Sequence, residues 1–261
     1  MGKVWIGTSG WHYKHWLGPF YPPALSTPRM LRYYTGYFDT VELNNTFYKL
    51  PAPASLSAWR DSTPEGFHFA VKGSRFLTHM KKLNNAEAGL KKFLDAACIL
   101  GPKLGPILFQ LPPNWEINLE RLDAFLALLP RGVRCAFEFR NATWNIPRTY
   151  ELLTRYHAAY CIYDLAGYLS RIEITADFTY VRLHGPGGKY QGSYSNAALQ
   201  EWARKISDWQ RALSAVYVYF DNDDSGHAPR DALRLRELAC PNRPLPRSPL
   251  HRAGGLARPM E

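Results

Sequence analysis

Cysteine is scarce in this sequence of 261 residues, and the few cysteines are far apart. No CxxC pair occurs among Cys98, Cys135, Cys161 and Cys240, so the spacing typical of a structural zinc site is absent. Three of them lie in apolar runs. We therefore expect reduced thiols in a cytoplasmic protein.

Long apolar runs and several familiar motifs are also missing. No stretch approaches the ~20 apolar residues of a membrane-spanning helix, so we expect no membrane partner. The chain begins directly with a strand-like run at Val4–Thr8, and we expect no signal peptide. GxSxG and GK(S/T) do not occur. Gly7-Thr8-Ser9-Gly10 is not followed by the helix that a dinucleotide-binding turn requires.

Acidic residues are outnumbered, and the formal net charge is +10. Part of the excess lies in the Pro- and Arg-rich segment 240–261, which lacks apolar periodicity and which we expect to be a disordered tail. The remaining excess favours anionic partners such as phosphates, carboxylates or nucleic acid. A soluble basic surface would have the same composition.

Short β-rich runs alternate with helical stretches in the first 239 residues. The expected strands are Val4–Gly10, Thr40–Tyr48, Phe67–Gly73, Ile107–Leu111, Arg134–Arg140, Tyr160–Asp164, Tyr180–His184 and Val216–Asp221. The expected helices are Met30–Tyr37, Ala54–Ser62, Ala86–Leu104, Leu119–Leu129, Arg148–Tyr156, Asn196–Leu213 and Arg230–Ala239. Segment 165–178 has weak helical character. This pattern predicts one α/β domain over 1–239, a (βα)8 TIM-type barrel with a short or missing sixth helix.

Alternation with period two sorts the strand residues into two faces, one toward the helices and one toward the barrel lumen. If the apolar sets face the helices, a polar set points inward near the carboxyl ends of the strands, where such barrels carry their active sites. For strand six, Tyr160–Asp164, the apolar pattern decides the inward face least clearly. The inward set is Glu42, Lys72, Gln110, Glu138, Arg140, Asp164, Arg182, His184 and Asp221. The competing interpretation is an internal salt-bridge network, with Gln110 and Arg182 as deeper support.

Three loops border this mouth. The first is aromatic and includes Trp11 and Tyr13, which could stack on a ligand or form part of a small core. The loop after strand seven is Gly-rich and contains Lys189 and Tyr190; it could bind phosphate, or its glycines could serve conformation alone. The loop after strand three is basic, which is also typical of a solvated surface. Candidate substrate-binding residues are Trp11, Tyr13, Asn44, Gln110, Trp144, Arg182, Lys189, Tyr190, Asp221 and Asn222.

Several motifs in order resemble a known family. They are Gly7-Thr8-Ser9-Gly10-Trp11, Phe20-Tyr21-Pro22, Thr40 to Tyr48, Gln110 to Pro113, Phe137 to Arg140, Tyr180 to Gly185 and Tyr219 to Asp223. Over residues 4–239 the chain is similar to domain of unknown function 72, the YecE-like proteins. The resemblance implies a β/α barrel but transfers no catalytic residue. Where the family tends to have Arg-His-x-Ser-Trp, this chain has Asn141 in place of the histidine, and the tail looks like an addition.

The inward charges favour an enzyme, of hydrolase or isomerase type, acting on a small anionic substrate. Glu42 and Glu138 would be the acid/base pair, and Lys72 and Arg140 would stabilise negative charge. His184 and Asp164 are candidate proton carriers or metal ligands. The inward carboxylates are also compatible with a divalent cation as cofactor.

Two other functions stay open: nucleic-acid binding with or without phosphodiester cleavage, and metabolite binding without chemistry. No residue pattern indicates the oligomeric state.

Overall fold

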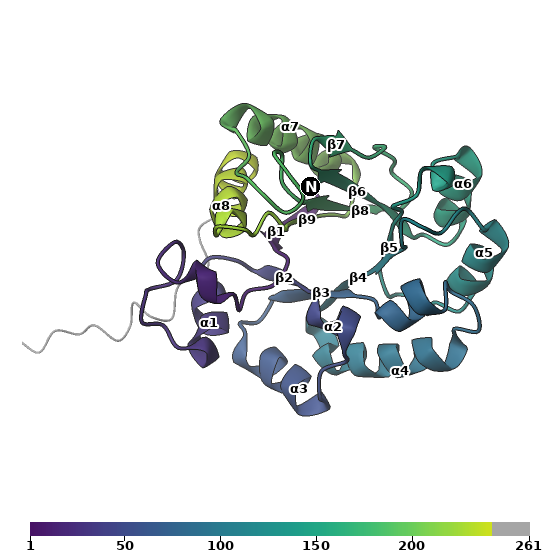
Figure 1. Cartoon of the computed structure of the whole chain (residues 1–261), viewed down its shortest axis with the longest axis horizontal. Helices are drawn as coiled ribbons and strands as arrows, with labels where there is room; N and C mark the ends of the chain where they lie inside the picture. The colour runs from purple at the N-terminus through teal and green to yellow at the C-terminus, as the bar shows by residue number, and fades with distance from the viewer. Residues whose placement is uncertain (242–261) are drawn as a thin grey trace, which may run out of the picture.

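A nearly closed barrel of eight parallel strands, with the helices outside it, forms the fold (Figure 1). The structure is a computed structural model that describes residues 1–241; most of the predicted tail lies outside the described residues. The strands are β1 (Lys3–Thr8), β2 (Thr40–Leu43), β3 (His68–Lys72), β4 (Leu104–Gln110), β5 (Cys135–Glu138), β6 (Ala159–Leu165), β7 (Tyr168–Leu169), β8 (Phe178–Leu183) and β9 (Ala215–Phe220). All but β7 belong to the parallel barrel.

Helices connect most of these strands, as the alternation predicts. They are α1 (Thr27–Tyr34), α2 (Asn45–Tyr48), α3 (Pro53–Ser62), α4 (Glu87–Ala97), α5 (Leu119–Ala127), α6 (Pro147–Arg155), α7 (Asn196–Ala212) and α8 (His227–Ala239). Four short helical turns are η1 (Lys14–Trp16), η2 (Phe76–Met80), η3 (Cys98–Lys103) and η4 (Ala142–Trp144). The second strand ends earlier than expected, because residues 45–48 form the short helix α2.

The seam between β1 and β2 closes the barrel largely through side chains. The hydroxyl of Tyr34 accepts from the Thr8 amide and donates to the Thr40 carbonyl, at 3.0 Å each, so it replaces a direct backbone contact. One parallel bridge joins Ser9 to Glu42. Gly7 faces the Thr40 carbonyl so closely that a Cβ would lie 2.3 Å from its oxygen. A glycine at this position therefore lets the two strands meet.

Two buried clusters confirm the assignment of strand faces, with one exception. Between the strands and the helices lie side chains such as Val41, Phe69 and Phe137. A separate cluster fills the lumen with Trp5, Ala70, Leu108, Ala136, Cys161, Tyr180, Tyr217 and Tyr219, among others. On β6 it is Cys161 that faces the lumen, while Ile162 packs on the helix side. The sequence-based assignment of strand six was therefore inverted.

No helix lies between β6 and β8 in the described chain, in agreement with the weak helical signal there. Instead β7 folds back antiparallel on β6, pairing Asp164 with Leu169. Tyr168 and Leu169 are 51% and 43% exposed, because no helix covers them. Nowhere in residues 1–241 is a helix both long and apolar enough to cross a membrane.

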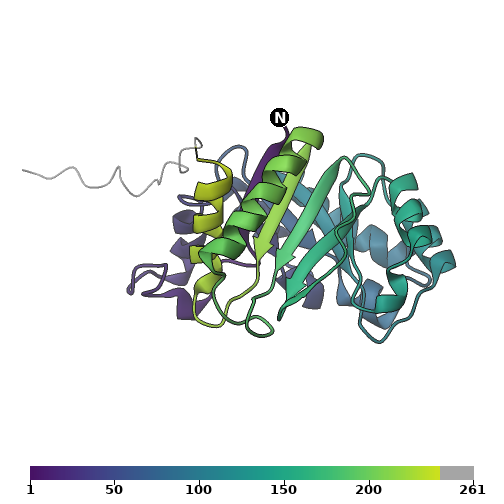
Figure 2. The same cartoon turned by 90° about the horizontal axis from the view of Figure 1, so that it is seen from above.

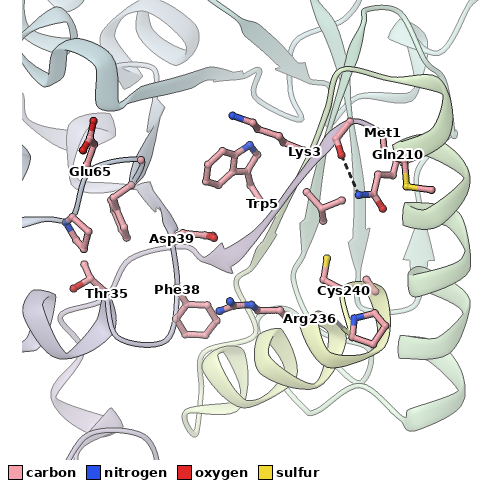
Figure 3. Close-up of a pocket in the computed structure, with 17 residues that line it drawn as sticks. Met1, Lys3, Trp5, Thr35, Phe38, Asp39, Glu65, Gln210, Arg236 and Cys240 are labelled. Carbon is pink, nitrogen blue, oxygen red and sulfur yellow. Dashed lines mark hydrogen bonds between the residues drawn. The ribbon is translucent and has the colours of Figure 1, made fainter. Parts of the chain in front are cut away.

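The amino end of the barrel contains an open groove of about 960 Å³ (Figure 3). It lies close to the N-terminus, which is marked in Figure 2, and to the end of α8. Trp5, Phe38 and Arg236 are among its lining residues, and Gln210 Nε2 donates to the Gly2 carbonyl at 3.0 Å. Conserved chemistry in β/α barrels sits at the opposite, carboxyl end of the strands. Four of the buried polar and charged side chains in the described residues, Glu42, Glu138, Arg182 and His184, converge at that carboxyl end.

Candidate active site

Arg182 lies at the centre of the carboxyl-terminal mouth. It occupies the penultimate position of β8 and is 1% exposed. Its guanidinium donates to Glu42 through Nε (3.0 Å) and Nη2 (2.8 Å), to Glu138 through Nη1 (2.9 Å) and to Asp221 through Nη2 (3.1 Å). We call these four residues the arginine clamp. They tie β2, β5, β8 and the end of β9 together.

Glu42 has no spare acceptor capacity. Besides the two Arg182 bonds, Oε1 accepts from the Ser9 hydroxyl and Oε2 accepts from the Tyr180 hydroxyl at 2.6 Å. The side chain is completely buried. Four donors occupy the lone-pair sites of this carboxylate and leave none directed at a ligand.

Glu138 is also completely buried and paired with two arginines. Arg140 Nε donates to Oε1, and the Cys161 thiol lies 3.8 Å from Oε2. Burial alone would raise the pKa of Glu138, but Arg140 and Arg182 outweigh it and hold this pKa well below its usual range. Arg140 also stacks on the Tyr163 ring, 4.4 Å from its centroid.

His184 is neutral in this arrangement. Its Nε2 lies 2.8 Å from Arg140 Nη2 and 3.3 Å from Arg182 Nη1, so it must accept, and Nδ1–H then donates to Asp221 Oδ2 at 3.0 Å. Burial and the Arg182 charge lower the pKa of His184. The pKa of Asp221 is lowered as well, because the His184 bond and Arg182 outweigh its burial.

Lys72 differs from the two arginines because it has no carboxylate partner. It ends β3, and no ion pair or hydrogen bond of its amine occurs within residues 1–241; Nζ lies 4.7 Å from the centroid of the Phe47 ring. Burial and the nearby Arg182 charge lower the pKa of Lys72 to about 8. A substantial fraction of this amine is therefore uncharged slightly above neutral pH.

Three predicted residues surround the clamp at the mouth. Tyr13 donates to the Ser9 carbonyl at 2.9 Å and lies near Asn44. The Asn44 Oδ1 atom is buried and has no donor among the described residues. Tyr190 covers His184 with its ring, at 5.4 Å between centroids. An unsatisfied buried acceptor at this position is consistent with a ligand that donates there.

A second, smaller contact joins the first loop to the loop after β9. Asp223 accepts from the Trp16 indole N–H, and His15 Nε2 lies 3.3 Å from its other oxygen. Burial raises the pKa of Asp223 to about 6, although Trp16 and His15 oppose the shift. The aromatic loop otherwise forms a small core around Trp16, which is completely buried.

Several predicted site residues lie elsewhere. Asp164 was expected in the lumen, but it shares the helix-side face of β6 with Ile162 and lies near Tyr194. Trp11 packs edge-on against Trp59 and is 5% exposed, and Trp144 is completely buried against Phe139. In sequence, aromatic rings that line a mouth and aromatic rings that fill a core look alike.

The remaining candidates have supporting positions. Asn222 is buried and donates to the Gly192 carbonyl (2.8 Å) and to Asp231 (2.9 Å), so it anchors the Gly-rich loop. Lys189 is exposed on that loop, above the Tyr190 ring. Gln110 ends β4 beside Glu138 in the strand register.

The carboxylates considered for a divalent cation are occupied by arginine. Within residues 1–241 no group of three or more His, Cys, Asp or Glu side chains could hold a metal ion. Glu42, Glu138 and Asp221 do converge, but the Arg182 guanidinium lies between them. All four cysteines are free thiols.

Several contributors were missed by the sequence reasoning. Tyr180 lies two residues before Arg182, so the same alternation places it in the lumen, but it was not among the candidate residues. Ser9 and Tyr163 carried no comparable signal, since an isolated hydroxyl beside an apolar run is common. The contact of Asp223 with Trp16 joins residues 207 positions apart, and no local pattern indicates it.

Comparison with known proteins agrees with this architecture. A solved DUF72 family protein from Thermotoga maritima is 27% identical and superposes with a TM-score of 0.80, covering 90% of this chain and 98% of that one. The UPF0759 protein YunF of Bacillus subtilis is 28% identical over 90% of this chain and 94% of its own length. The UPF0759 protein YecE of Escherichia coli is 29% identical over 53% of this chain and 48% of its own.

The sequence model of one family covers nearly the whole chain. It matches residues 5–252, so it extends into the segment that was expected to be an addition to the family pattern. With the barrel and the relatives above, this match assigns the chain to the DUF72 family, described as proteins of unknown function.

Proposed function

We propose that this protein is an enzyme acting on a small phosphate- or carboxylate-bearing substrate at the carboxyl-terminal mouth of the barrel, with proton-transfer chemistry of the hydrolase or isomerase type. The observation that carries the proposal is the distribution of unused hydrogen-bonding capacity. Glu42 accepts from four donors and Glu138 is paired with two arginines, whereas the Lys72 amine has no anionic partner among the described residues. A ligand that brings a negative charge fits this imbalance.

The geometry supports a division of roles that differs from the sequence-based one. Glu42 accepts from four donors, and the pKa of Glu138 is held low by two arginines, so both suit positioning of Arg182 and Arg140 better than proton transfer. Lys72, whose pKa is about 8, is closer to the range in which a group exchanges protons at neutral pH. The acid/base assignment therefore moves from the two glutamates to the open groups at the mouth.

Anion binding tests the proposal directly. Inorganic phosphate and a set of small phosphate esters would be titrated by calorimetry at low ionic strength, followed by assays for ester hydrolysis and isomerisation. Replacing one charged donor removes about 1.5–3 kcal/mol, so Lys72→Met should weaken binding about tenfold or more.

The exposed Lys91 offers a matched control, and Lys91→Met should leave the affinity unchanged. If phosphate and the esters fail to bind at low ionic strength, or if both variants bind equally well, the proposal is wrong.

A second candidate, nucleic-acid binding, is favoured by exposed apolar groups beside the basic rim. Tyr48 and Met80 are 77% and 69% exposed, and Lys81 lies over the Phe76 ring. Rings next to lysines can stack on unpaired bases. Anisotropy of a labelled single-stranded oligonucleotide should then fall steeply with salt, and Tyr48→Ala should weaken binding. No binding at low salt removes this candidate.

A further inference from the structure

Lys72 combines a central position with the absence of a charged partner. As the last residue of β3, it occupies the end of the barrel where β/α barrels position reactive groups. The other cations of the mouth, Arg140 and Arg182, are each paired with glutamate. In residues 1–241 no carboxylate oxygen lies within ion-pair distance of the Lys72 amine.

The charges around Lys72 act against an ammonium ion. After burial, the largest contribution to its lowered pKa is repulsion by Arg182, and three carboxylates only partly offset it. The groups concerned are Arg182, Glu42, Glu138, Asp221 and His79. A residue serving only as a permanent positive charge would gain from a carboxylate beside it. The surroundings instead favour the free amine, the form that attacks carbon.

Apolar and neutral groups border the same amine. Phe47, 8% exposed on α2, presents its ring to Nζ, and the ring of His79 packs edge-on against Phe47 at 5.0 Å. Burial and the charge of Lys72 lower the pKa of His79 to about 4, so this imidazole is neutral at pH 7. Water is thereby limited on one side of the amine without introducing a counter-charge.

We infer that Lys72 is a nucleophile that forms an imine with an aldehyde or ketone carbon of an anionic substrate, which rests on the proposed function of the mouth. The neutral amine adds to the carbonyl carbon to give a carbinolamine. The carbinolamine oxygen then takes protons and leaves as water. Overall, the ammonium form and the carbonyl compound give a protonated imine and one water, with charge and hydrogens conserved. The imine withdraws electrons from the neighbouring carbon, which suits isomerisation or carbon–carbon cleavage.

Reductive trapping tests the inference on the full chain. Glycolaldehyde phosphate, or glycolaldehyde as its uncharged match, is added with sodium cyanoborohydride, and the adducts are located by intact mass and peptide mapping. We expect one dominant adduct on Lys72, formed at least tenfold faster than on Lys91, whose side chain is 77% exposed. Its rate should rise with pH through about 8 as the amine loses its proton.

Two variants and one competitor separate the possible results. Lys72→Arg should remove the dominant adduct, and Lys91→Arg should retain it. Labelling of Lys72 no faster than of Lys91 overturns the inference; if inorganic phosphate still binds, the anionic-substrate proposal survives alone. Equal rates for both aldehydes, with no protection by phosphate, support the imine and overturn the anionic-substrate proposal instead.

Discussion

The substitution Glu42→Gln tests whether Glu42 is part of a structural clamp or a proton carrier. Each of its oxygens accepts from one Arg182 N–H, Oε2 from Nε and Oε1 from Nη2. A glutamine amide must therefore direct an N–H at a guanidinium N–H in either orientation. The Ser9 and Tyr180 hydroxyls can rotate to accept, but the guanidinium cannot.

The expected cost follows from the burial of the pair. Removing one partner of a buried ion pair costs about 3–5 kcal/mol, and the lower end applies because Arg182 retains Glu138 and Asp221. For a domain of this size, about 3 kcal/mol corresponds to a fall in Tm of roughly 10 °C.

Differential scanning calorimetry of Glu42→Gln against Glu116→Gln gives the comparison, since Glu116 is exposed and forms no ion pair in the described chain. The control should unfold within about 0.5 kcal/mol of the unmodified protein. A Glu42→Gln protein that melts with the control yet loses turnover would refute the clamp and restore the sequence-based acid/base role.

Three further predictions concern charge and pH. Lys72→Met should raise the free energy of unfolding at pH 7 by about 2 kcal/mol in urea, because the folded state holds the pKa of Lys72 below its ordinary 10.5; a lower urea midpoint would contradict this. The lowered pKa values of Glu138 and Asp221 stabilise the fold at pH values above their ordinary pKa values of 4.5 and 3.8. The free energy of unfolding should therefore fall as the pH drops below about 5, and less steeply in Glu138→Gln. The same pH dependence in both proteins would exclude Glu138 as the cause. The raised pKa of Asp223 means that its protonated form favours folding, and this contribution is lost as the pH rises through about 6. The fluorescence of Trp16, which donates to Asp223, should titrate at the same pH. If the transition persists in Asp223→Asn, it belongs to another group.

The strand faces could be read from the sequence wherever one face was uniformly apolar. On β5, Cys135 and Phe137 alternate with Ala136 and Glu138, and both faces lie where alternation places them. On β6 the run from Tyr160 to Tyr163 is apolar or aromatic on both faces, so alternation had nothing to discriminate.

The clamp itself could be predicted as a set of inward charges but not as a bonding pattern. Whether Arg182 bridges three carboxylates or contacts a ligand depends on distances set by strand register and barrel shear. Within residues 1–241 Lys72 has no charged partner, which is equally invisible in sequence because it follows from Arg182 and Arg140 occupying the nearby glutamates.

The side-chain seam between β1 and β2 has a consequence for the order of folding. Ser9 reaches Glu42 across 33 positions, a separation that one β–helix–β unit can close early. Arg182 is 140 positions from Glu42, so a chain collapsed without β8 would hold an uncompensated carboxylate at its own seam. Docking of β8 therefore completes the barrel and assembles its mouth in one step, and the gain in free energy comes at that step. Partly folded chains lack both the stability of the closed barrel and an assembled mouth. Kinetic traps should therefore accumulate before β8 docks rather than after it.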